Sequence, residues 1–278
     1  MPYRHAHFYV GFVLLVILAG FWASYWSPIA TVPLAFHFHA VSAVAWLTLL
    51  IVQSVTIQRR ANALHKQLGL ASLALFPFLI LGLVMIIDVA AQRYAAKESA
   101  FVLHNSPSFG IGTAIAIAAY LTLFYQALKS RRTVRLHAGY MLATPLILFE
   151  SPFSRVIGEF LPWMNVIGSP GIHAVQDTIA ISDAMAFAFA MALYTMNRRH
   201  GAPWLVAAGF IALQALVMWF APFVPQLGAA FDGYARIPLT VTAPAGLAAG
   251  TVAGWLGWRA GAAPQRPREA IAAMGPSG

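Results

Sequence analysis

The stretch FYVGFVLLVILAGFWASYW, residues 8–26, contains no charged side chain over a length that can cross a membrane. A helix of this length spans the ~30 Å hydrocarbon layer, and it satisfies its own backbone hydrogen bonds, as lipid requires. Similar stretches recur along the chain, so that 60% of its 278 residues are hydrophobic and only 9% are charged. An ordinary soluble domain has roughly 25% charged residues. The sequence therefore predicts an all-α, polytopic bundle of transmembrane helices.

About eight apolar segments are long enough to be considered membrane spans. They lie near residues 8–26, 34–57, 68–87, 107–128, 136–150, 172–196, 203–224 and 237–258. In the last span Gly246, Gly250 and Gly254 recur at four-residue spacing, which predicts close packing against another helix. We expect residues 1–260 to form a single transmembrane domain. The polar, proline-containing residues 261–278 are expected to form a disordered cytoplasmic tail.

The lysines and arginines are divided unevenly between the two ends of these spans. With the N-terminus inside, the outer side receives four of the seventeen, namely Arg93, Lys97, Arg155 and Arg236. Because short cytoplasmic loops carry an excess of Lys and Arg, this bias predicts that both termini are cytoplasmic, and we expect a bacterial inner membrane. The basic residues lie in short turns between helices. Topology therefore explains the net charge of +9 without a nucleic-acid partner.

The composition and the missing motifs exclude several classes of chemistry. The chain has no cysteine, which excludes disulfides, thiolate metal sites, iron–sulfur clusters and covalently attached c-type haem. It has no Walker loop, no Gly-rich dinucleotide fingerprint and no Gly-x-Ser-x-Gly elbow. ATP hydrolysis, NAD binding and serine hydrolysis are therefore not expected, and any metal must be bound by His, Met or carboxylates.

An internal repeat marks two histidines. The segment RRANALHKQLGLAS (59–72) aligns without a gap on RRTVRLHAGYMLAT (131–144), which indicates a repeated helical hairpin and places His65 and His137 at equivalent positions. A third arginine turn has Trp204 at this position, so the fold alone does not require histidine there. Two histidines at one membrane depth suit a ligand that bridges two helices, since neutral imidazole binds metals and haem iron. The alternative is that both simply begin helices at the lipid interface.

A second group of polar residues lies on the outer side of the membrane. His37 and His39 are two residues apart on a helix, so only one of them can face the bundle interior. His173 and Asp177 are four apart and share a helix face, which would let the carboxylate orient the imidazole. The candidate ligands of a non-haem metal on this side are His37, His39, His104, His173, Asp177 and Glu150. Such a set suits zinc, iron or copper.

Two acids lie inside predicted spans, where an ionisable side chain is costly and usually faces the bundle interior or a cavity. Asp183 stands about ten residues, or ~15 Å, into the sixth span. Glu150 ends the fifth span, and Arg155 is close enough in the chain to pair with it. Both acids are candidates for a buried functional group, with a purely structural role as the alternative. Asp88 ends the third span and is expected to be solvated.

The order of the histidines along residues 36–144 resembles the ascorbate-dependent transmembrane cytochrome b family, because they alternate between the outer and inner ends of successive spans. In that family a four-helix core holds two b-type haems, each ligated by two histidines from different helices. The resemblance implies an outer haem on His39 and His104, and an inner haem on His65 and His137. The whole sequence is also similar to a group of uncharacterised bacterial multipass proteins that share a His-rich second span, an arginine turn and the pattern Leu-His-x-x-Leu-Gly.

Three functions follow as hypotheses. The first is a b-type haem protein that transfers electrons, with quinone or a periplasmic redox protein as its partner. The second is a membrane metalloenzyme with an outer site of histidines and a carboxylate. The third is a non-redox carrier or assembly protein in which Asp183 and Glu150 bind protons or a substrate, as polar groups within helical repeats do in transporters. Membrane lipid surrounds the protein in each case.

Overall fold

The computed structural model describes residues 3–161, 163 and 174–262, and this part of the chain consists of helices and turns without any strand. Six of its helices are long and apolar enough to cross a membrane. They are α2 (Leu34–Gln58), α3 (Asn62–Ala95), α4 (Ala100–Lys129), α7 (Ala174–Met196), α8 (Ala202–Phe220) and α10 (Leu239–Ala260). Four shorter α-helices are α1 (Ala6–Gly20), α5 (Val134–Ala143), α6 (Glu150–Phe160) and α9 (Pro225–Tyr234). The prediction of an all-helical chain built from several apolar helices is confirmed.

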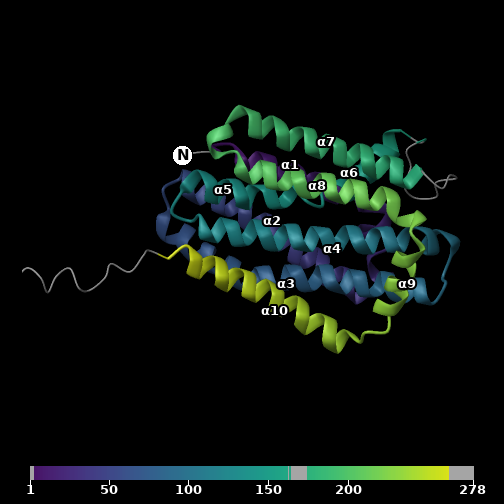
Figure 1. Cartoon of the computed structure of the whole chain (residues 1–278). Coiled ribbons are helices and arrows are strands. Elements are labelled where there is room, and N and C mark those ends of the chain that lie inside the picture. Colours follow the sequence, from purple (N-terminus) through teal and green to yellow (C-terminus); the bar gives the residue numbers. More distant parts are fainter. Residues whose placement is uncertain (1–2, 162, 164–173, 263–278) are drawn as a thin grey trace, which may run out of the picture.

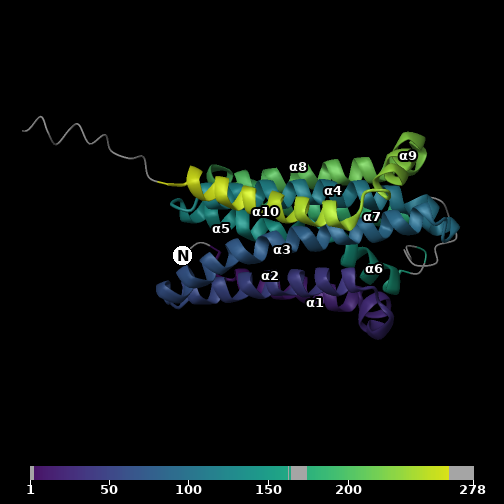
Figure 2. The same cartoon turned by 90° about the horizontal axis from the view of Figure 1, so that it is seen from below.

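The long helices run side by side along one direction, as Figure 1 shows, and α9 lies across one end of the bundle. In the view from below, α1 and α2 form one side, α8 and α10 lie toward the other, and α3 runs between them (Figure 2). The contacts between helices agree with this arrangement, since α2 packs against α1 and α3, and α10 packs against α3 and α4. Large apolar side chains such as Leu15, Val41, Leu216 and Val252 are exposed on the outside. Such a surface suits lipid better than water.

An aromatic cluster forms the centre of the core. The rings of Phe76 on α3 and Phe124 on α4 stack at 3.9 Å between centroids, and Trp46 on α2 packs at 5.5 and 5.6 Å from them. The indole Nε1 of Trp46 also donates to the hydroxyl of Thr144, at 3.0 Å. One buried side chain therefore ties α2, α3 and α4 to the segment that follows α5.

The glycines of α10 allow it to lie directly against α3 and α4, as their spacing predicts. A Cβ atom at Gly250 would lie 2.7 Å from the Cα of Pro77, which is backbone and cannot move aside easily. At Gly246 it would meet Val84, and at Gly254 it would meet Phe124. Small residues thus let the helix backbones approach closely, which supplies the packing that associates helices in lipid.

The predicted fifth span, residues 136–150, is not one helix. Helix α5 ends at Ala143, a short 3-10 turn (Thr144–Leu146) follows, and α6 begins at Glu150. Pro145 explains the break, because proline has no backbone N–H to donate and its ring clashes with the preceding helical turn. Figure 1 shows α5 and α6 one after the other along the bundle axis, and this pair, in the place of the predicted fifth span, is named the interrupted crossing below.

The helix ends also differ from their predicted positions elsewhere. Helix α3 extends beyond the predicted span 68–87 at both ends, so that Asp88 lies inside the helix and does not end it. In the first predicted span α1 ends at Gly20, and a π-helical turn, Trp22–Trp26, follows. Gly20 lies directly against Pro152 of α6, because a Cβ atom there would overlap the Pro152 carbonyl. Helix α4 begins at Ala100 with Ser99 as its N-cap, so His104 lies within the helix and not before it.

Asp88 is buried, although the sequence analysis expected it to be solvated. Its side chain accepts hydrogen bonds from the hydroxyls of Tyr234, at 2.6 Å, and Thr242, at 2.7 Å. These two partners lie on α9 and α10, more than a hundred residues away in the chain. The carboxylate of α3 therefore fixes α9 and α10 to α3.

Candidate ligand-binding cavity

A cavity of about 820 Å³ lies inside the bundle, bounded mainly by α1, α2, α3, α4 and the interrupted crossing α5–α6. Its wall is mostly apolar and includes Phe36, Leu83 and Leu148. The polar side chains on the wall are Ser24, Tyr25, Thr31, His39, Arg93, Thr113, Tyr120, Glu150, Ser151, Arg155 and Gln214. A volume of roughly 300–1,000 Å³ with few polar groups is typical of a small-molecule site.

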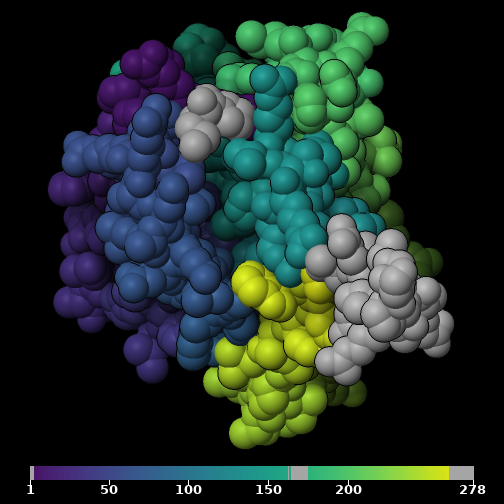
Figure 3. Space-filling view, turned by 90° about the vertical axis from the view of Figure 1, so that its left-hand side faces the viewer, coloured from purple at the N-terminus to yellow at the C-terminus, as the bar shows by residue number. Residues whose placement is uncertain are grey.

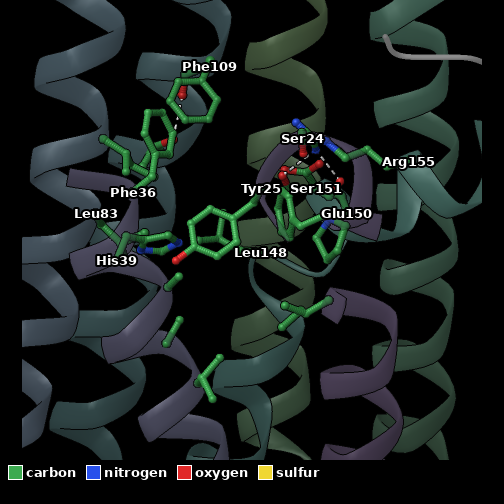
Figure 4. Close-up of a pocket in the computed structure, with 18 of the residues that line it drawn as sticks. Ser24, Tyr25, Phe36, His39, Leu83, Phe109, Leu148, Glu150, Ser151 and Arg155 are labelled. Atoms are coloured by element: carbon green, nitrogen blue, oxygen red, sulfur yellow. Dashed lines mark hydrogen bonds between the residues drawn. The ribbon is translucent and has the colours of Figure 1, made fainter. Parts of the chain in front are cut away.

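Figure 4 shows how some of the polar side chains of the cavity lie. His39 lies beside Phe36 and Leu83, Ser24, Ser151, Glu150 and Arg155 lie together on the other side, and Tyr25 lies between them. His39 is placed by the close approach of α3 to α2, because a Cβ atom on Gly82 would lie 2.9 Å from the His39 Cα. The imidazole Nδ1 of His39 is enclosed and has no protein partner.

Glu150 is the first residue of α6 and lies where the crossing is interrupted. Its side chain is 5% exposed, and its Oε1 accepts a long hydrogen bond of 3.4 Å from the amide Nε2 of Gln214. Gln214, on α8, is itself only 1% exposed, and its Oε1 has no partner. The carboxyl group and the amide therefore form a polar pair at the apolar wall, and part of their hydrogen-bonding capacity remains unused.

Asp183 on α7 is a second buried acid close to Glu150. It is 1% exposed, its Oδ2 has no hydrogen-bond partner, and the two carboxyl groups are near enough to repel each other when charged. Two buried carboxylates in one apolar region are costly unless a proton or a cation lies between them. The structure thus brings together the two acids that the sequence marks as candidate buried ionisable residues.

Arg155 lies one helical turn beyond Ser151, and its position is fixed by that residue. Its guanidinium donates to the Ser151 carbonyl oxygen at 2.6 Å and to the Ser151 Oγ at 3.0 Å, and it lies 4.9 Å from the ring of Phe21. Its Nε is buried without a partner. Among the described residues the ion pairs are Arg93–Glu98 and Arg236–Asp232, so Arg155 attracts Glu150 without forming a close pair with it.

The two histidines expected to hold an outer haem face different parts of the molecule. His39 faces the cavity, whereas the ring of His104 packs edge-on against Phe223, with 6.4 Å between centroids. His37 does not line the cavity, and its Nδ1 lies 3.0 Å from the hydroxyl of Tyr25. As the helical spacing predicts, only His39 of the adjacent pair lines the interior cavity.

The histidines expected to hold an inner haem lie near each other. His65 and His137 each stand in the first turn of their helix, and the two imidazoles are close enough to influence each other electrostatically. The Nδ1 of His137 lies 2.9 Å from the carbonyl oxygen of Ala127. Since a carbonyl can only accept, this nitrogen carries the proton, and the other nitrogen of a neutral ring is left with its lone pair.

The candidate outer metal ligands are not gathered into one site in the described part of the chain. Asp177 is exposed on α7, Glu150 is buried in the cavity wall, and His37 is bonded to Tyr25. His173 lies outside the described residues. Within the ranges that the structure describes, no group of three or more His, Asp or Glu side chains is arranged to hold a metal ion.

Two residues of the cavity, Tyr25 and Gln214, were missed by the sequence analysis as site residues. The partner of Tyr25 is His37, and the partner of Gln214 is Glu150, 64 positions away in the chain. For Gln214 a signal existed, because it is the one amide in the otherwise apolar run GFIALQALVMWF, residues 209–220. A polar side chain in such a run is expected to find a buried partner.

Comparisons with protein-family models, with curated proteins and with solved structures found no match to this chain. Its function must therefore be inferred from the cavity and from the buried polar groups themselves.

Proposed function

We propose that this protein is a membrane carrier that binds a small amphipathic molecule in the cavity and couples this binding to protonation of Glu150 and Asp183. The observation that carries the proposal is the position of Glu150. It lies at the first residue of α6, where the crossing is interrupted, and it is buried in the cavity wall beside Gln214.

The interrupted crossing supports this proposal because non-helical backbone is unfavourable in a membrane. It is tolerated where it is covered by protein or lines a cavity, and many transporters bind their substrates at such breaks. Here Pro145, Leu148 and Phe149, from the break itself, all line the cavity. The break therefore brings polar backbone and the Glu150 side chain to the place where a ligand would bind.

The buried acids support the proton-coupled part of the proposal. Glu150 contacts the cavity, and Asp183 lies behind it with an unpaired oxygen. A ligand that approaches Glu150 changes the free energy of the charged form of this carboxyl group. The proton then moves to the carboxyl group on which it is more stable, or it leaves the site. Binding and protonation are linked in this way without any further group.

Covalent labelling with a hydrophobic carbodiimide tests this function, since the reagent modifies protonated carboxyl groups in apolar sites. We expect labelling at Glu150 or Asp183 in membranes, decreasing as the pH rises, and its loss in the Glu150→Gln, Asp183→Asn double variant. Matched controls are Glu159→Gln on α6 and Asp177→Asn on α7, because both acids are exposed. Labelling that survives in the double variant, or that is lost in the controls, would contradict the proposal.

We also propose that the bundle crosses a bacterial inner membrane eight times with both ends inside. The crossings are α1, α2, α3, α4, α5 with α6, α7, α8 and α10. Figure 3 looks onto one end of the bundle, where the turn after α2, the turn after α4 and the end of α10 gather, and the first two carry arginine pairs. Reporters active only in the cytoplasm should work when fused after Arg60, Arg132 or Arg199 and fail after Ala96; the reverse pattern contradicts this topology.

A second candidate function, b-type haem binding, is favoured by the proximity of His65 and His137. The Nδ1 of His137 donates its proton in a hydrogen bond to the Ala127 carbonyl oxygen, so the other ring nitrogen is available to bind iron. This is the usual arrangement of a ligating histidine. Haem would supply one-electron redox chemistry at this end of the bundle. The test is a reduced-minus-oxidised spectrum of the purified protein, in which His65→Ala and His137→Ala should each abolish the same band. A colourless wild-type protein would exclude it.

A further inference from the structure

A groove on the outside of the bundle adjoins the cavity and bears on the chemical class of its ligand. It follows α2 from His37 to Val52, and Leu68 and Leu75 of α3 form its other side. Its volume is about 750 Å³, and its walls are almost wholly apolar. It is open to the surface that α2 presents to lipid, since Val41 in its wall is 69% exposed.

The groove and the cavity share part of their walls. Tyr25, Trp26, Ala40 and Val44 line both hollows. Ala40 and Val44 are four residues apart and therefore lie on one face of α2. The two hollows therefore lie next to each other and share this stretch of α2 as a wall.

The residues at this boundary are held in place by one another. Tyr25 and Trp26 belong to the π-helical turn, and their rings pack edge-on at 4.8 Å between centroids. The Tyr25 hydroxyl is bonded to the His37 Nδ1 at 3.0 Å, which holds the ring against the start of α2. The boundary is therefore a defined rim between cavity and groove.

The length of the groove indicates what can fill it. From His37 to Val52 the helix rises about 22 Å, which is most of the ~30 Å hydrocarbon layer. An apolar groove of this length on the lipid-facing surface suits one long hydrocarbon chain, whereas a small polar solute would find almost no hydrogen-bond partners along it.

We propose that the ligand is an amphiphile with one long hydrocarbon chain, which enters sideways from the bilayer. Its polar head lies in the cavity between His39 and Glu150, and its chain passes Ala40 and lies in the groove along α2. This inference rests on the proposed function and deepens it. The chain is an acyl chain of a membrane lipid, because the groove opens onto the surface that α2 presents to lipid.

Photolabelling in lipid nanodiscs tests the inference, with a diazirine-bearing palmitate in one arm and a diazirine-bearing isoprenoid quinone analogue in the other. We expect the palmitate probe to modify the groove segments 37–52 and 68–75 more strongly than the exposed face of α7, which bulk lipid also reaches. Labelling of both faces to the same extent by this probe, or preferential labelling of the groove by the quinone analogue alone, would overturn the inference.

The variant Ala40→Trp fills the boundary between groove and cavity, and Ala188→Trp adds the same side chain at an exposed position of α7. Labelling of cavity residues should fall roughly tenfold in Ala40→Trp, which corresponds to a loss of about 1.4 kcal/mol in binding free energy. It should stay unchanged in Ala188→Trp. Unchanged cavity labelling in a folded Ala40→Trp protein would contradict entry past Ala40. Labelling of the groove does not require Glu150 or Asp183. It can therefore persist in the Glu150→Gln variant even if the proton-coupled function fails.

Discussion

The amide of Gln214 on α8 reaches the carboxyl group of Glu150 at the start of α6, with 3.4 Å between Nε2 and Oε1. Both residues are almost fully buried, and they are 64 positions apart in the chain. This contact joins α8 to the interrupted crossing at the wall of the cavity. It leaves the Gln214 Oε1 and the nearby Asp183 Oδ2 without partners. The polar centre of the protein is thus only partly satisfied, as expected of a site that receives a ligand or a proton.

The substitution Asp183→Asn should leave the protein folded and inserted, because an amide has nearly the same size as a carboxylic acid and can still donate or accept a hydrogen bond. Asp183→Lys should impair insertion, since a lysine at the centre of a membrane helix costs about 3 kcal/mol. The amount of protein in the membrane fraction measures both effects. Equal amounts of the two variants would show that position 183 does not lie at membrane depth.

Asp88→Ala should lower the free energy of unfolding by about 1–3 kcal/mol, because it leaves the buried hydroxyl of Thr242 and the half-buried hydroxyl of Tyr234 without their acceptor. The control is Asp232→Ala, which removes an exposed ion pair with Arg236 worth about 0–1 kcal/mol. Thermal unfolding in detergent compares the two. Equal stability of both variants would mean that Asp88 does not hold α9 and α10 to α3.

Gly250→Ala should destabilise the protein by about 1–3 kcal/mol, because the added Cβ atom meets the Pro77 backbone at 2.7 Å. Gly209→Ala is the matched control, since nothing lies within 4 Å of a Cβ atom at this position of α8. There the loss of chain flexibility should stabilise the helix by about 0.5–1 kcal/mol. Opposite shifts of the melting temperature are expected. If both variants were stabilised, α10 would not pack closely against α3.

The helices could be predicted from the sequence because a membrane span depends mainly on local apolar length, which residues 34–57 or 237–258 show directly. The glycine contacts of α10 followed from spacing within one helix. The break after α5 was missed because Thr144 and Pro145 lie inside an apolar run, where composition outweighed the effect of one proline.

The candidate site could be predicted only in part. Asp183 and Glu150 stood out as acids within apolar segments, and the structure places them together. The cavity itself depends on contacts between distant residues, such as Gln214 with Glu150, which no local pattern contains. The burial of Asp88 was missed for the same reason, because its partners belong to α9 and α10.

The proposed binding of an amphipathic molecule is tested most directly by a cryo-electron microscopy map of the protein in lipid nanodiscs prepared from its native membrane. We predict non-protein density in the cavity between His39 and Glu150, with an extension past Ala40 into the groove along α2. Wild-type protein should show this density, and the Ala40→Trp variant should lose the extension at the boundary. A cavity closed by its own side chains, or filled by separate water molecules alone, would contradict the account.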